Sequence, residues 1–249
     1  DSAGNAGPAA TTENYEVETL APSVSSIVIS SATGLQNSFL NAGDVVSVTA
    51  TFSENVPVTG TPQLTLVVGG TNRTATYTSG SESTTLVFKY TIQAGDNDTN
   101  GISIGANVLA LNSGTIKDAA GNDATITHSS VAANSSYKVD TTAPSVDNFT
   151  ISDTLLTIGE TMAVTLVFSE AVCTDSSVCD SNVFSSAADI TVPNLDNGTT
   201  SGTLPTMTSS DNKTWEGTFT PTANIVPPPL HPPAMSYFEL ATRVATSTP

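Results

Sequence analysis

An internal repeat constrains the fold of this 249-residue chain more than any other feature of its sequence. GDVVSVTATFSENV (43–56) recurs as GETMAVTLVFSEAV (159–172), and the opening DSAGNAGPAATTENYEVETLAPSV recurs as DAAGNDATITHSSVAANSSYKVDTTAPSV (118–146). Equivalent residues lie 116 to 122 positions apart, which is the size of one β-sandwich domain. The repeat therefore predicts tandem domains with boundaries near Pro22 and Pro144.

Within each repeat, apolar residues alternate with polar ones, as in strands that bury a single face. The predicted buried faces are Val46, Val48, Ala50 and Phe52; Leu86, Phe88, Tyr90 and Ile92; and Met162, Val164, Leu166 and Phe168. Gly-rich turns such as VGGTN and TSGSES separate these runs, and no run has a convincing helical period. This pattern predicts an all-β fold of antiparallel β-sandwiches.

The charge balance excludes several kinds of partner. Acidic residues number 23 against 6 basic ones, for a net charge of −17, and the basic residues form no patch. A polyanion or an anionic bilayer is repelled by such a chain, whereas small cations are attracted. No apolar run has the length of a membrane span. We therefore expect neither nucleic-acid binding nor membrane insertion.

Several longer motifs resemble the tandem immunoglobulin-like repeats of giant secreted bacterial surface adhesins. They are FSENVPVTGTPQLTLVVGGTNRTATYTSG (52–80), YTIQAGDNDTNGISI (90–104), GTIKDAAGN (114–122) and YKVDTTAPSV (137–146). The likeness covers nearly all of residues 1–225, and WEGTFTPTANI (215–225) resembles a related repeat type. From Val226 the Pro-rich sequence departs from the repeat, which puts the last strands of the second domain in doubt.

The resemblance implies tandem Ig-like sandwiches and an extracellular, cell-surface location. The expected domains are 1–21, the terminal strand of a preceding repeat; 22–143, a complete repeat; 144–225, a second and possibly incomplete repeat; and 226–249, a divergent tail. The implied function is that of a stalk or spacer that supports adhesion or biofilm formation, with neighbouring repeats as partners. The alternative is a module that binds a glycan or a protein.

The residues needed for catalysis are missing. Only His128 and His231 could serve as a general base of the imidazole type, and neither lies in a catalytic motif. Glu54 and Glu170 both follow Phe-Ser, but they occupy the same position in successive repeats and so cannot flank one glycosidic bond. We therefore expect no enzymatic activity.

The stretch AGDNDTNGISI (94–104) has the spacing of a calcium loop. Asp96, Asp98 and Asn100 would supply side-chain oxygens, and Gly101 would allow a sharp turn. The twelfth position, where an EF-hand has Glu, is Asn107, so the loop is not an EF-hand. The alternative is an Asx-turn cluster without an ion. The sequence leaves both possibilities, and we expect Ca²⁺ as the cofactor.

A second candidate calcium cluster lies near the domain junction. Asp118 and Asn122 belong to the DAAGN turn, and Asp140 precedes the boundary. In the adhesin repeats that the chain resembles, acidic groups at junctions often hold calcium and stiffen the rod. The alternative is again turn formation, because AAGN forms turns readily without an ion.

Two further predictions concern pairing. Cys173 and Cys179 lie close together in VCTDSSVCD, and a disulfide between them is expected in an oxidising compartment. The alternative is two unpaired thiols, one of them buried. Residues 1–19 match the last turn and strand of a repeat, which the second domain lacks. The N-terminal segment of one chain could therefore complete the second domain of another, head to tail, as a filament subunit. Alternatively, the boundaries reflect only where a longer array was divided.

Overall fold

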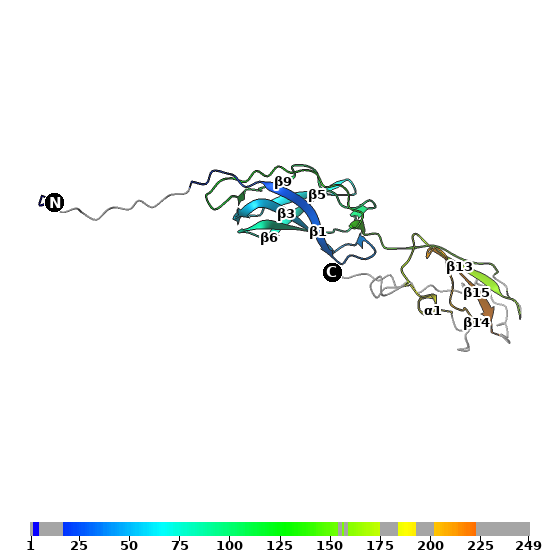
Figure 1. The fold of residues 1–249 in the computed structure, drawn as a ribbon. Coiled ribbons are helices and arrows are strands. Elements are labelled where there is room, and N and C mark those ends of the chain that lie inside the picture. Colours follow the sequence, from blue (N-terminus) through cyan, green and yellow to red (C-terminus); the bar gives the residue numbers. More distant parts are fainter. Residues whose placement is uncertain are drawn as a thin grey trace. The chain divides into compact units, whose positions relative to one another are not determined.

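The computed structural model describes residues 2–4, 17–153, 156, 159–174, 184–192 and 202–222. The chain divides into two compact units: the first takes Asp1–Gly34 and Leu40–Asp140, and the second takes Leu35–Phe39 and the chain from Thr141 onward. Regular structure in both consists mostly of antiparallel strands (Figure 1). The predicted all-β class of Ig-like sandwiches is confirmed.

The first unit is built around a six-stranded sheet with the order β1-β3-β7-β6-β5-β9. Its strands are β1 (Val24–Thr33), β3 (Val45–Val56), β7 (Ser83–Thr91), β6 (Thr71–Ser79), β5 (Gln63–Val68) and β9 (Leu109–Ala110). A two-stranded sheet pairs β10 (Thr115–Ile116) with β4 (Val58–Thr59), and a three-stranded sheet has the order β2 (Phe39–Leu40), β11 (Lys138–Asp140), β8 (Asn97–Asp98).

The core of the first unit contains the faces that the alternating pattern predicted. The inward residues of β3 are Val46, Val48, Ala50 and Phe52, and all are buried. Leu86, Phe88, Tyr90 and Ile92 are buried in the same cluster. Burying such a side chain contributes about 1.5–3 kcal/mol for the larger apolar residues. The two-residue period of the sequence therefore identifies the central pair of strands.

The second unit has a smaller sheet, in which β12 (Val146–Ile151) and β13 (Met162–Phe168) pair as β1 and β3 do in the first unit. Its four-stranded sheet has the order β12, β13, β15 (Thr214–Pro221), β14 (Gly202–Thr203). The described residues also include a short helix, α1 (Ser186–Asp189). The predicted face of β13 is buried and packs with Trp215 and Phe219.

The Phe-Ser-Glu motif has the same structural role in both units. Ser53 donates its backbone N–H to the carbonyl of Ser23 at 2.9 Å, and the Ser53 hydroxyl accepts the N–H of Ser23 at 3.0 Å. Ser169 and Ser145 make the same two bonds at 2.8 and 3.0 Å. These reciprocal bonds fix the start of β1 against β3 and the start of β12 against β13, which explains why the motif recurs.

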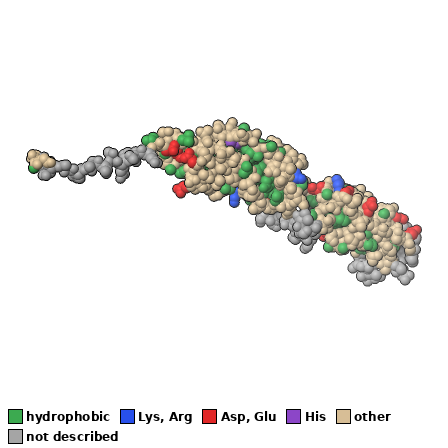
Figure 2. All heavy atoms as spheres, viewed as in Figure 1, with side chains coloured by type: hydrophobic (Ala, Val, Ile, Leu, Met, Phe, Trp, Pro, Cys, Tyr) green, Lys and Arg blue, Asp and Glu red, His purple; other side chains and the backbone are tan. Residues whose placement is uncertain are grey.

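Charged side chains are sparse on the visible surface, where backbone and uncharged polar groups predominate (Figure 2). Only 12% of the residues are charged, and most of these are acidic. Within the part of the chain that the structure describes, no helix is long and apolar enough to cross a membrane.

Candidate functional site

Asp96, the first residue of the predicted calcium loop, is a buried partner of other side chains. It is 2% exposed, although it follows β7 in a surface loop. Its Oδ1 accepts a hydrogen bond from Arg73 Nε at 2.6 Å, and Arg73 Nη2 lies 2.5 Å from the same oxygen. Its Oδ2 accepts the Tyr90 hydroxyl at 2.5 Å and the Gln93 N–H at 3.0 Å. Both carboxylate oxygens therefore have protein donors.

The pKa values of this cluster follow from its burial and hydrogen bonds. Burial alone would raise the pKa of Asp96, but the hydrogen bonds from Tyr90, Gln93 and Arg73 outweigh it and hold the pKa below its ordinary value. Burial, followed by the hydrogen bond to Asp96, raises the pKa of Tyr90 to about 12. At neutral pH the cluster thus consists of a carboxylate, a guanidinium and a neutral phenol.

Asp98 accepts hydrogen bonds from backbone groups of two different loops. Its Oδ2 accepts the Gly69 N–H at 2.7 Å, which connects β8 to the turn between β5 and β6. Its Oδ1 accepts the N–H groups of Gly101 at 2.8 Å and Asn100 at 3.2 Å. This geometry is that of an Asx turn, in which an aspartate caps the backbone two and three residues ahead. The carboxylate is 4% exposed.

Asn100 and Gly101 complete the turn in different ways. The side chain of Asn100 is exposed, whereas Asp96 and Asp98 are buried. Asn100 contacts Asp98 through its backbone N–H, which donates to the Asp98 carboxylate. Gly101 has a φ of 98°, and a Cβ there would collide with the carbonyl oxygen of Asn134. The glycine is therefore required by the backbone itself. The described contacts of this loop correspond to the Asx-turn alternative.

The junction residues also make contacts of a structural kind. Asp118 is 4% exposed, and its Oδ1 and Oδ2 accept the backbone N–H and the side-chain amide of Asn122 at 2.8 and 2.6 Å. The same amide donates to the Glu18 carbonyl at 3.3 Å. Asp140 lies on β11, where it pairs in register with Asn97. Asp118 and Asn122 thus lie beside the segment that enters the first unit, whereas Asp140 lies on the strand from which the chain leaves it.

Burial and hydrogen bonding also oppose one another at Asp118. Burial would raise its pKa, but the bonds from the Asn122 amide and from the N–H groups of Asn122, Gly121 and Ala120 hold the pKa below its ordinary value. No three His, Cys, Asp or Glu side chains of the described residues form a group that could hold a metal ion. Calcium at either predicted cluster stays a prediction. Turn formation accounts for the local contacts of Asp98, Asp118 and Asn122, whereas Asp96 is held by Arg73 and Tyr90 from neighbouring strands.

The predicted disulfide involves the second unit. Cys173, which follows β13, is disulfide-bonded. Its expected partner Cys179 lies outside the described residues.

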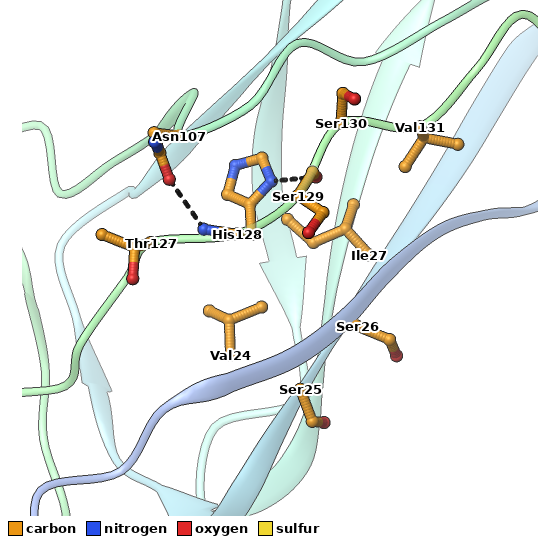
Figure 3. Close-up of a pocket in the computed structure, with 10 residues that line it drawn as sticks. All are labelled: Val24, Ser25, Ser26, Ile27, Asn107, Thr127, His128, Ser129, Ser130 and Val131. Carbon is orange, nitrogen blue, oxygen red and sulfur yellow. Dashed lines mark hydrogen bonds between the residues drawn. The ribbon is translucent and has the colours of Figure 1, made fainter.

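A cavity of about 510 Å³ lies along β1 of the first unit (Figure 3). One wall is the first part of β1, Val24–Ile27, and the other is the segment from Thr127 to Val131, with Asn107 beside it. Serine and threonine hydroxyls line much of it, and His128 is its one imidazole. No Phe, Tyr or Trp lines the cavity, so a sugar would lack the large aromatic surfaces on which sugars usually stack.

His128 holds two segments of the first unit together. Its Nε2 accepts the N–H groups of Val108 at 2.9 Å and Leu109 at 3.3 Å, and its Nδ1 lies 2.8 Å from the carbonyl of Ser129. Nδ1 therefore carries the proton and donates it to Ser129, which is the neutral tautomer with Nε2 free to accept. The backbone N–H of His128 donates to Asn107 Oδ1 at 2.9 Å (Figure 3). This histidine has a structural role.

Replacing His128 with phenylalanine is expected to lower the free energy of unfolding by about 1–2 kcal/mol, because the Val108 and Leu109 N–H groups lose their acceptor. Urea titration of the variant measures this loss. The matched control is Ser130→Ala, which removes a hydroxyl from the same cavity wall and is expected to change the stability by less than about 0.5 kcal/mol. Equal stability of the His128 variant and the parent would contradict the structural role.

The fold and these contacts define a class: tandem β-sandwich modules whose buried polar residues stabilise turns. Residues 140–228 match the family described as Bacterial Ig-like domain, and this range contains β12, β13, β14 and β15. Domains of this family are generally non-catalytic structural modules. No curated protein matches the chain. The second unit is therefore similar to bacterial Ig-like domains in both sequence and fold.

Proposed function

We propose that the chain is a structural spacer of a bacterial cell-surface adhesin, in which tandem Ig-like units hold a binding region away from the cell. The observation that carries the proposal is that, among the described residues, the two units repeat structural contacts and no polar site recurs in both. Both units keep the buried faces of β3 and β13 and the reciprocal serine bonds, Ser23 with Ser53 and Ser145 with Ser169. A spacer requires a repeated stable fold and no chemistry in each unit.

The polar residues that looked most like a site support the same function. Asp96 and Asp98 use their carboxylates to tie loops to strands, and Asp118 closes its own turn on Asn122. These contacts stiffen the ends of a unit. The proposal therefore does not require calcium. An ion bound at the junction near Asp140 would add further stiffness there, and this remains part of the proposal.

A glycan-binding module is the main alternative, and Trp215 argues against it. Its ring is 8% exposed and packs edge-on against Phe184, with ring centroids 4.9 Å apart. Its Nε1–H donates to the Asn212 carbonyl at 3.3 Å. The only tryptophan of the chain thus belongs to the core of the second unit. Sugar recognition by stacking on exposed aromatic rings has little support.

Force spectroscopy on the whole chain, held between two marker domains of known strength, tests the proposed function. We expect the first unit to unfold in one step that releases roughly 40 nm of chain, the contour length of the chain from Pro22 to Asp140 at about 3.5 Å a residue. A glycan array probed with the same protein is expected to give no saturable binding. Unfolding without a discrete step, or a saturable glycan ligand, would contradict the spacer function.

A further inference from the structure

Among the described residues, the outer edge of β1 is left without a pairing strand along most of its length. β1 is the edge strand of the six-stranded sheet and pairs on one side with β3. On its other side, Val24 donates its N–H to the Thr125 carbonyl at 3.2 Å, and Ser23 bridges Thr125 in parallel. Beyond that point the segment 127–131 diverges from β1, and Val131 pairs with Ile104 instead. In the described part of the chain, no strand pairs with this edge from Ser25 to Thr33.

The opposite edge of the same sheet is covered. β9 pairs with β5, and Val67 exchanges both backbone hydrogen bonds with Ser103 at 2.8 and 3.1 Å. An uncovered edge with free N–H and C=O groups is a template for another strand. Natural edges carry charges, prolines or bulges that oppose such pairing. β1 has two bulges, between Val24 and Ser26 and between Ile29 and Ser31, but its ten residues include no charge and no proline.

The sequence of this edge indicates its partner. Residues 25–31 read Ser-Ser-Ile-Val-Ile-Ser-Ser, which is a palindrome centred on Val28. Two antiparallel copies of such a strand, related by a two-fold axis at Val28, place Ile27 opposite Ile29 and Ser26 opposite Ser30 of the other copy. Each residue of the palindrome then faces a residue of the same type in the other copy. Val28, which is 47% exposed on the outer face, meets its own copy.

We propose that the first unit associates with a second copy of this chain through antiparallel β1–β1 pairing about Val28. The cavity of about 510 Å³ beside Val24–Ile27 leaves space along this edge for an incoming strand. The two six-stranded sheets join into one. The contact is lateral, lies beyond the proposed spacer function and does not depend on it.

The second unit lacks these features at the equivalent edge. β12 is also an edge strand and has its bulge at the same place, between Val146 and Asn148. However, it carries Asp147 where β1 has Ser25, and Thr150 where β1 has Val28. Two copies of β12 would bring carboxylates to a shared edge, which opposes pairing. The second unit therefore supplies matched control positions in the same protein.

Sedimentation of the full chain over a range of concentrations tests the proposal. We expect the mass to rise from the monomer value toward twice that value. Because each copy carries a net charge of −17 while the edge itself is uncharged, association is expected to strengthen with added salt. A parent chain that stays monomeric at millimolar concentration and high salt overturns the proposal.

Charge variants at the two-fold axis test the register. Val28→Lys and Val28→Glu alone are each expected to weaken association at least tenfold, since like charges meet across the strands. An equimolar mixture of the two is expected to associate again, because residue 28 faces residue 28. Thr150→Lys and Thr150→Glu are the controls and are expected to leave association unchanged. The melting temperature of each variant checks its folding, which a half-exposed outer side chain should preserve. Association unaffected by Val28 variants, or no recovery in the mixture, places the contact elsewhere and overturns the proposal.

Discussion

Replacing Asp96 with asparagine is expected to lower the free energy of unfolding of the first unit by about 2–4 kcal/mol at neutral pH. The neutral amide no longer attracts the Arg73 guanidinium, and it offers one oxygen where the carboxylate serves Arg73, Tyr90 and Gln93 with two. The Tyr90 hydroxyl and the Gln93 N–H then compete for that oxygen or remain unpaired. Urea unfolding of the variant and the parent, compared at pH 7, measures the loss.

The same substitution should flatten the acid side of the stability profile. The pKa of Asp96 lies lower in the folded protein than in the unfolded chain, so its contribution is fully present above about pH 4 and is lost as the pH falls through the folded-state pKa. On the alkaline side, Tyr90 has its pKa raised to about 12, so its contribution disappears as the pH rises from about 10 to 12. Titrating the phenol by ultraviolet absorbance should give a lower pKa in Asp96→Asn, because the hydrogen bond to the carboxylate is gone.

Asp123→Asn is the matched control. Asp123 forms an ion pair with Lys117 at 2.7 Å, but its side chain is 78% exposed. Exposed pairs of this kind contribute at most about 1 kcal/mol. A loss of stability as small in the Asp96 variant as in this control would show that the buried cluster does not stabilise the fold.

The alternating sequence predicted the core residues because the two-residue period of a strand depends only on residues that are close together in the chain. Val46, Val48 and Ala50 needed only their own spacing to be assigned to the buried face of β3, and the same holds for Met162, Val164 and Leu166 on β13. The repeat added independent support, since the two segments share the pattern. Such features depend on neighbours in the chain, and so the sequence predicts them well.

The partners of the acidic residues could not be predicted in the same way, because they come from other loops and strands. Arg73 on β6 and Gly69 in the β5–β6 turn reach Asp96 and Asp98 only once the sheet has formed. One signal was available for Tyr90: its place on a predicted buried face meant that its hydroxyl required a buried partner. The D-x-D-x-N-G spacing suits both an ion and an Asx turn, so spacing alone could not decide between them.

Asp98→Ala is expected to lower the free energy of unfolding by about 2–4 kcal/mol, and by the same amount with calcium as with EDTA. The substitution leaves the N–H groups of Gly69, Asn100 and Gly101 without their carboxylate acceptor, in a place where water has little access. Because Gly69 lies in the β5–β6 turn, the loss also disconnects that hairpin from β8. Thermal melting of the variant and the parent in both conditions measures it.

Calcium changes the outcome in a way that separates the two hypotheses for this loop. If an ion binds at Asp98 and Asn100, calcium raises the stability of the parent by RT ln(1 + [L]/Kd), and both Asp98→Ala and Asn100→Ala lose that increment. If the aspartate only forms the turn, calcium stabilises neither protein, and Asn100→Ala, whose side chain is exposed, changes the stability little. The contacts of Asp98 favour the second result. An increment from calcium in the parent that disappears in Asn100→Ala would instead establish an ion at the DNDTNG loop.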